Sequence, residues 1–146
     1  MRRLLLALTV LFAPNVAAAQ AMVEMPWARA TAPAAMSGAA YMTVTSAIDD
    51  HITSVTTPAA ATAELHETID QNGVMRMEAR PDMPLTGGKP LTMKPGSFHV
   101  MLLGLKAPLK QGDIFRLTVT FEKSPPMTVD VKIEAAGAAG PGAHSH

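Results

Sequence analysis

The chain has 146 residues, and its 12 basic and 12 acidic side chains give a formal charge of zero at neutral pH. It has no basic run, which argues against a nucleic-acid partner. It has no cysteine, which excludes disulfides, thiol redox chemistry, iron–sulfur clusters and cysteine-ligated metal sites. Methionine, in contrast, occurs 11 times, beside only four Phe, one Tyr and one Trp, and most of these methionines are expected to fill gaps in the core.

The first 19 residues have the organisation of a secretory signal peptide. Arg2 and Arg3 precede an apolar run over residues 4–13, and small residues follow where a signal peptidase would cut. We expect cleavage after Ala19, with Ala21 as the alternative. The apolar run has about ten residues, roughly half of what a membrane-spanning helix needs. No cysteine follows it to carry a lipid. The mature chain is therefore expected to be exported, with neither a lipid anchor nor a membrane span.

Apolar and polar side chains alternate along the rest of the chain, with the period of a half-buried strand. We predict strands at residues 23–30, 39–46, 51–57, 61–69, 74–79, 97–105, 114–121 and 127–134. Pro26 places the first strand at a sheet edge, because proline has no N–H to donate to a ladder. Short strands separated by turn sequences predict a single all-β domain over residues 20–134, a Greek-key β-sandwich or barrel.

One hairpin can be placed in register from its turn. The Asn-Gly pair at residues 72–73 is a strong signal for a two-residue hairpin turn. That turn brings His66 opposite Ala79, and paired residues share one face of a sheet. His66 and Met77 therefore become diagonal neighbours on the same face. A shift of one residue would place them on opposite faces, so the prediction depends on the turn.

A second histidine–methionine pair lies on the predicted strand 97–105. Phe98, Val100 and Leu102 alternate onto one face, which leaves His99 and Met101, together with Leu103, on the other. Thioether sulfur is a soft donor that suits Cu(I), and imidazole binds several metals, whereas zinc sites mostly use Cys, His and carboxylate. The four side chains therefore predict a four-coordinate site for one Cu(I) ion, made by His66, Met77, His99 and Met101.

The spacing H-x10-M-x21-H-x-M of these four residues resembles the metal motif of the periplasmic copper chaperones of the PCu(A)C family. Flanking segments agree with the family, among them WARAT at 27–31, AELHE at 63–67 and KPGSFHVMLLGLK at 94–106. The resemblance covers about residues 23–134. It implies a cupredoxin-like β-sandwich that holds one Cu(I) through the same four residues. It also implies delivery to the CuA centre of cytochrome c oxidase, with the copper-accepting oxidase subunit and Sco-type proteins as partners.

Two features depart from the family pattern. Many members carry a methionine two residues after the first histidine, where this chain has Thr68, so weaker copper capture is expected. Some members also carry a long extension rich in His and Met that binds Cu(II). Here residues 135–146 are rich in Ala and Gly and are expected to form a flexible tail. Only His144 and His146 could bind Cu(II) there, and weakly.

Several alternatives stay open. Met75 shares the predicted face of Met77 and is an alternative ligand, and Met83 lies in a loop that either closes over the site or packs into the core. A copper buffer without a dedicated client needs the same site as a chaperone, and an assembly module would carry the cluster by chance. An enzyme is not expected, because no Ser/His/Asp or paired-carboxylate arrangement is recognisable. A monomer is expected.

Overall fold

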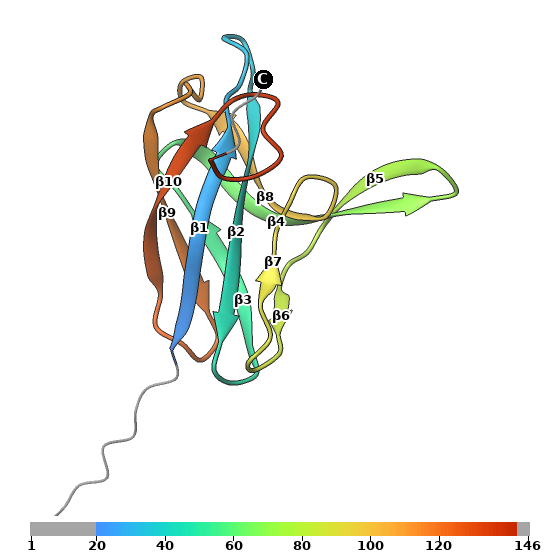
Figure 1. The fold of residues 1–146 in the computed structure, drawn as a ribbon, viewed down its shortest axis with the longest axis vertical. Helices are drawn as coiled ribbons and strands as arrows, with labels where there is room; N and C mark the ends of the chain where they lie inside the picture. The colour runs from blue at the N-terminus through green and yellow to red at the C-terminus, as the bar shows by residue number, and fades with distance from the viewer. Residues whose placement is uncertain (1–19, 143–146) are drawn as a thin grey trace, which may run out of the picture.

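The computed structural model describes residues 20–142 (Figure 1). The predicted signal peptide, residues 1–19, lies outside the described residues, and so do His144 and His146. Within the described range all of the regular structure is β-strand. This part of the chain contains no helix of the length and apolar character needed to cross a membrane.

Residues 20–142 form ten strands. They are β1 (Ala21–Arg29), β2 (Ser37–Ser46), β3 (Asp50–Thr56), β4 (Ala60–Gln71), β5 (Val74–Ala79), β6 (Met83–Leu85), β7 (Leu91–Thr92), β8 (Phe98–Leu105), β9 (Ile114–Phe121) and β10 (Met127–Glu134). Eight of them are the predicted strands, whose ends differ from the prediction by at most two residues. The short strands β6 and β7 were not predicted, because two or three residues cannot display a period-two pattern.

The strands form one continuous sheet in the order β5-β4-β8-β2-β1-β10-β9-β3-β6, and β7 pairs with β2. In the described part of the chain every pairing is antiparallel except that of β1 with β10. The sheet curls so that β3 also contacts β4. Figure 1 shows the strands standing in two layers, with the β4–β5 hairpin projecting from one side. The predicted all-β sandwich is thereby confirmed.

Pro26 does not mark a sheet edge, contrary to the prediction. Strand β1 lies inside the sheet, between β2 and β10. Its register with β2 shifts between Glu24 and Trp27, and Met25 has a φ of 47°. The proline therefore falls in a β-bulge, where the ladder is interrupted and the missing N–H costs no hydrogen bond.

The core lies between the layers and contains several of the methionines. The largest fully buried side chains are Met42, Ile52, Met83, Leu102 and Leu117. Met83 thus packs into the core from β6 and does not cover the predicted site. On β8, Val100 and Leu102 are also fully buried. Their burial fixes the face of β8, so that His99 and Met101 point to the opposite side.

Residues 135–142 return to the sheet, although they belong to the segment expected to be flexible. Ala138 is buried, and its carbonyl accepts a hydrogen bond of 2.8 Å from Arg29 Nε. The backbone N–H of Gly142 donates to the Glu134 carboxylate at 3.2 Å. Small side chains leave little to bury, but they let the backbone itself approach the sheet. The described part of the expected tail is therefore packed.

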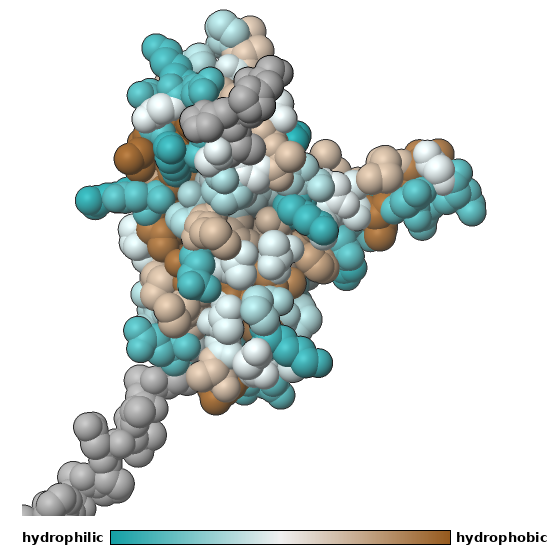
Figure 2. Space-filling view, in the orientation of Figure 1, coloured by the Kyte–Doolittle hydropathy of each residue, from teal (hydrophilic) through white to brown (hydrophobic). Residues whose placement is uncertain are grey.

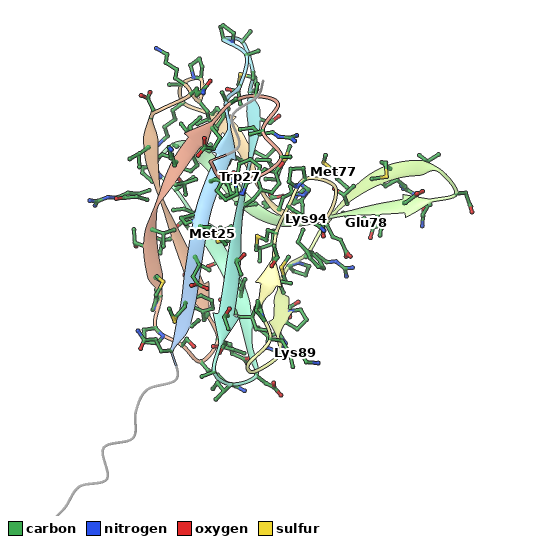
Figure 3. The ribbon with its side chains drawn as sticks, viewed as in Figure 1. Met25, Trp27, Met77, Glu78, Lys89 and Lys94 are labelled. Carbon is green, nitrogen blue, oxygen red and sulfur yellow. The ribbon has the colours of Figure 1, made fainter. Side chains whose placement is uncertain are left out.

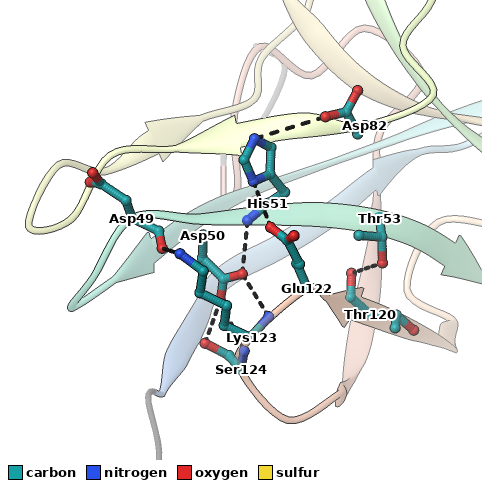
Figure 4. Close-up of polar contacts among 9 residues, drawn as sticks. All are labelled: Asp49, Asp50, His51, Thr53, Asp82, Thr120, Glu122, Lys123 and Ser124. Atoms are coloured by element: carbon teal, nitrogen blue, oxygen red, sulfur yellow. Dashed lines mark hydrogen bonds and ion pairs between the residues drawn. The ribbon is translucent and has the colours of Figure 1, made fainter.

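A buried carboxylate joins β3 to the segment after β9 (Figure 4). Asp50 accepts hydrogen bonds from the backbone N–H groups of His51, Lys123 and Ser124 at 2.8, 2.9 and 3.0 Å. The Ser124 hydroxyl donates a fourth at 2.6 Å. Burial raises the pKa of Asp50, but the four hydrogen bonds outweigh it and lower that pKa to about 2.

Candidate metal centre

The β4–β5 hairpin has the predicted register. Asn72 and Gly73 have φ values of 56° and 82°, as a type I′ turn requires. His66 pairs with Ala79, and Met77 pairs with Thr68. Because Thr68 lies two residues after His66 on β4, Met77 is on the same face of the sheet as His66. The diagonal relation between His66 and Met77 is therefore present. It was predictable because the Asn-Gly turn alone fixes the pairing.

Strand β8 flanks β4 on the side away from β5 and brings the second pair to the first. His99 lies directly opposite His66, and the two ring centroids are 5.7 Å apart. Met101 lies opposite Glu64. Because cross-strand partners share a face, all four predicted residues lie on one face that runs across β5, β4 and β8. The pairing of β4 with β8 was not predicted from the sequence.

The four residues differ in their exposure to solvent. His99 is buried, and the His66 side chain is 15% exposed. Met101 is half-buried, whereas Met77 is 63% exposed and lies near the base of the projecting hairpin (Figure 3). The imidazoles are therefore held within the sheet, and one thioether is open to solvent.

Each imidazole uses one nitrogen to fix its orientation. His66 Nε2 lies 3.0 Å from the Glu64 carboxylate, and His99 Nδ1 lies 3.2 Å from the Ser97 carbonyl. Both oxygens can only accept, so these nitrogens carry the hydrogens and donate. His66 Nδ1 and His99 Nε2 are then left with free lone pairs. Among the buried side-chain nitrogen and oxygen atoms in the described part of the chain, only these two have no hydrogen-bond partner.

This arrangement fits a metal ion. A metal-ligating histidine commonly donates its other N–H to a carboxylate or a backbone carbonyl, and both histidines do so here. Burial lowers the pKa of His99, an effect that the Ser97 carbonyl opposes and the nearby His66 reinforces. A lower pKa favours the neutral imidazole that a metal requires. Two nitrogen and two thioether donors form a neutral, soft set that suits Cu(I).

The described residues offer no alternative made of hard ligands. They contain no group of three or more His, Asp or Glu placed to hold a metal ion. Met75 lies two residues closer to the turn than Met77 and is 58% exposed, so it is further along the hairpin from His66. His144 and His146 lie outside the described residues.

An aromatic row continues from the histidines across the sheet. Tyr41 on β2 lies 6.5 Å from His99 and 4.6 Å from Trp27 on β1, measured between ring centroids. Trp27 and Tyr41 are buried. The row therefore places large, rigid side chains next to His99. The role of Glu64 was not predicted from the sequence. Its position two residues before His66 was a usable signal, because residues two apart on a strand point to the same face.

Comparison with known proteins identifies the family of this chain. The model of the LpqE-like family matches residues 21–133. A protein of Leifsonia xyli subsp. xyli named "Putative lipoprotein Lxx21020" is 38% identical over 84 residues. That match covers 56% of this chain and 51% of the relative. The chain thus spans about half the length of this curated relative.

Solved structures share the fold over most of the chain. The apo PCuAC domain of PmoF2 has a TM-score of 0.69 and 25% sequence identity, and the match covers 85% of this chain and 97% of that domain. The solution structure of CuI-DR1885 from Deinococcus radiodurans has a TM-score of 0.65 and 27% identity, with 83% of each chain covered. The cupredoxin-like fold is thus confirmed. The chain belongs to the LpqE-like family, the PCu(A)C copper chaperones that the spacing of its histidines and methionines resembles.

Proposed function

We propose that this protein is an exported metallochaperone that carries one Cu(I) ion in a site made by His66, Met77, His99 and Met101. The observation that carries the proposal is the pair of buried, unpartnered imidazole nitrogens on residues that face each other across β4 and β8. An unpartnered buried nitrogen costs stability unless something binds it. Copper in the solved structure of CuI-DR1885 supports this choice of metal.

The four donors have different parts in the proposed cycle. The imidazoles of His66 and His99 are oriented before copper arrives, by the Glu64 carboxylate and the Ser97 carbonyl. They hold the ion in the sheet. The exposed thioether of Met77 is the donor that an incoming protein reaches first. Exchange of one donor at a time lets the copper pass to an acceptor without being released into water.

The proposed acceptor is the CuA centre of cytochrome c oxidase in the periplasm, reached together with Sco-type proteins. Buffering of copper without a dedicated client would use the same four residues. Deletion of the gene separates the two roles. A chaperone predicts loss of the CuA centre with normal copper tolerance, whereas a buffer predicts copper sensitivity with a normal oxidase. The proposed role is transport and involves no catalytic reaction.

Anaerobic Cu(I) competition against a chromogenic chelator tests the site. One tight equivalent is expected for the wild-type protein, and Met77→Ala and Met101→Ala should each weaken it at least about tenfold. Met75→Ala is the matched control, because it removes another exposed thioether from the same hairpin. Met75→Ala and the double change His144→Ala/His146→Ala should leave the affinity unchanged. A wild-type protein without a tight equivalent, or one that loses it only in the His144/His146 variant, would contradict the proposed site.

A further inference from the structure

Strand β5 is an exposed edge strand. It ends the strand order of the sheet, and all six of its residues are exposed. Figure 1 shows the β4–β5 hairpin extending beyond the body of the sandwich, and Figure 2 shows hydrophobic and hydrophilic residues side by side along it. An edge with unpaired N–H and C=O groups is a template for another strand.

The register shows which backbone groups of β5 are free. In an antiparallel hairpin closed by a two-residue turn, alternate residues exchange hydrogen bonds with the partner strand, beginning with the pair that closes the turn. The residues of β5 that do not exchange hydrogen bonds with β4 are therefore Met75, Met77 and Ala79. Their backbone N–H and C=O groups point away from β4, to the open side of the sheet. In agreement, Thr68 opposite Met77 directs its own N–H away from β5, to the Ser97 carbonyl at 3.1 Å.

The charges on this edge are self-complementary. Arg76 and Glu78 flank Met77, so two β5 strands that pair antiparallel about Met77 place Arg76 of each opposite Glu78 of the other. Cross-strand pairs of opposite charge stabilise a sheet, and pairs of like charge destabilise it. The same register uses most of β5, because two-fold symmetry about Met77 also pairs Met75 with Ala79.

Among the described residues, neither of these two charges has an opposite partner. Arg76 Nη1 donates to the neutral side chain of Gln71 at 2.9 Å. Glu78 lies opposite Glu67 on β4, whose carboxylate is bound by Arg80. In the part of the chain that the structure describes, neither Arg76 nor Glu78 forms an ion pair. Both are therefore available to a second molecule.

We propose that β5 pairs with β5 of a second copy of this chain, antiparallel about a two-fold axis at Met77. Such an isologous contact continues the sheet, so the faces that carry the two sets of histidines and methionines become one surface. Met77 of one copy then lies beside Met77 of the other. The pairing is argued from the edge, register and charges of β5 alone. A role for the pairing in copper exchange between two copies rests on the proposed function. One short strand from each copy buries much less than a stable dimer requires, so the dimer is transient.

Sedimentation equilibrium of the metal-free full chain, up to the millimolar range, tests the pairing. Arg76→Glu and Glu78→Arg each create two pairs of like charge and should weaken self-association about tenfold. An equimolar mixture of the two variants should associate again. In the mixed dimer, both cross-strand pairs between positions 76 and 78 join an acidic side chain of one variant to a basic side chain of the other. Lys89→Glu reverses an exposed charge away from the hairpin and should have no effect (Figure 3).

The register has a separate readout. In a mixture of labelled and unlabelled wild-type chains, isotope-filtered NMR should show contacts between the Hα of Arg76 and the Hα of Glu78. A wild-type chain that stays monomeric throughout, or variants whose mixture fails to associate, would overturn the pairing. Because these experiments contain no copper, a failed copper titration leaves their result unaffected, and the two proposals can fail independently.

Discussion

Glu64 decides which nitrogen of His66 is free to bind. Its carboxylate accepts the N–H of Nε2 at 3.0 Å, which leaves Nδ1 as the atom without a partner. Without that acceptor, a neutral imidazole would distribute its hydrogen between both nitrogens, and a fraction of the molecules would present the wrong atom. Under the proposed function, Glu64 is thus a positioning residue, which would act on the metal through His66.

Glu64→Ala should weaken Cu(I) binding about tenfold, in the range typical of residues that orient a metal ligand. Glu64→Gln keeps an acceptor oxygen and should recover most of the affinity. The diagnostic measurement is the ¹⁵N spectrum of the imidazoles in the metal-free protein. His66 should change from a single tautomer to a mixture in Glu64→Ala, while His99, held by Ser97, stays as it is. An unchanged His66 tautomer would refute this role for Glu64.

At this scale the sequence predicted which residues form the candidate site, but not how they are oriented. Alternation placed His99 and Met101 on one face of their strand, and chemistry singled out the histidines and methionines. The tautomers depend on the Glu64 carboxylate and the Ser97 carbonyl, whose positions follow from the side-chain conformation and the turn before β8. No local pattern specifies those.

The β4–β5 hairpin is the element whose geometry the candidate site depends on most. Gly73 has a φ of 82°, where a residue with a Cβ is strained, and a Cβ at this position would meet no atom within 4 Å. A substitution there therefore tests backbone strain without a steric clash. The strain acts at the turn that holds the register of Met77 relative to His66.

Gly73→Ala should destabilise the hairpin by about 1 kcal/mol, because the left-handed conformation disfavours a side chain by that amount. Amide hydrogen exchange in β5 should then be about five times faster, since 1 kcal/mol corresponds to that factor in the opening equilibrium. Gly137→Ala is the control, since Gly137 also has open space around it and lacks a left-handed φ. Equal exchange rates in β5 of Gly73→Ala and the wild type would show that the turn does not limit the hairpin.

Elements with strong local signals were predicted, and elements defined by distant partners were not. The hairpin register followed from two residues at the turn. The place of β1 in the sheet did not follow from Pro26, because a proline without a ladder partner is equally compatible with an edge and with a bulge. The pairing of β4 with β8 joins segments that lie far apart in the sequence, and only the complete fold determines it.

For the whole molecule, Asp50 couples stability to acidity. An unfolded aspartate has a pKa of about 3.9, whereas the pKa of Asp50 in the fold is about 2. The unfolded chain therefore binds this proton more tightly, and acid favours unfolding. The contribution of Asp50 is complete above about pH 4 and is lost as the pH falls towards 2.

Asp50→Asn should lower the free energy of unfolding by about 2 kcal/mol at neutral pH, because hydrogen bonds to a charged acceptor are replaced by weaker ones and one donor lacks an acceptor. The variant should also lose part of the decrease in stability between about pH 4 and pH 2. Urea unfolding at a series of pH values measures both effects. Asp113→Asn, at an exposed position, is the control. A parallel pH dependence in Asp50→Asn and the wild type would contradict this role.

The four proposed copper donors lie in two parts of the molecule that are held with different firmness. His66, His99 and Met101 are on strands with a neighbour on each side, whereas Met77 is on a strand held from one side only. Fraying of β5 would therefore lower the number of donors from four to three while the sandwich stays folded. Under the proposed function, a protein that draws the hairpin aside would loosen the cargo without unfolding the carrier, so that release is governed by a local opening.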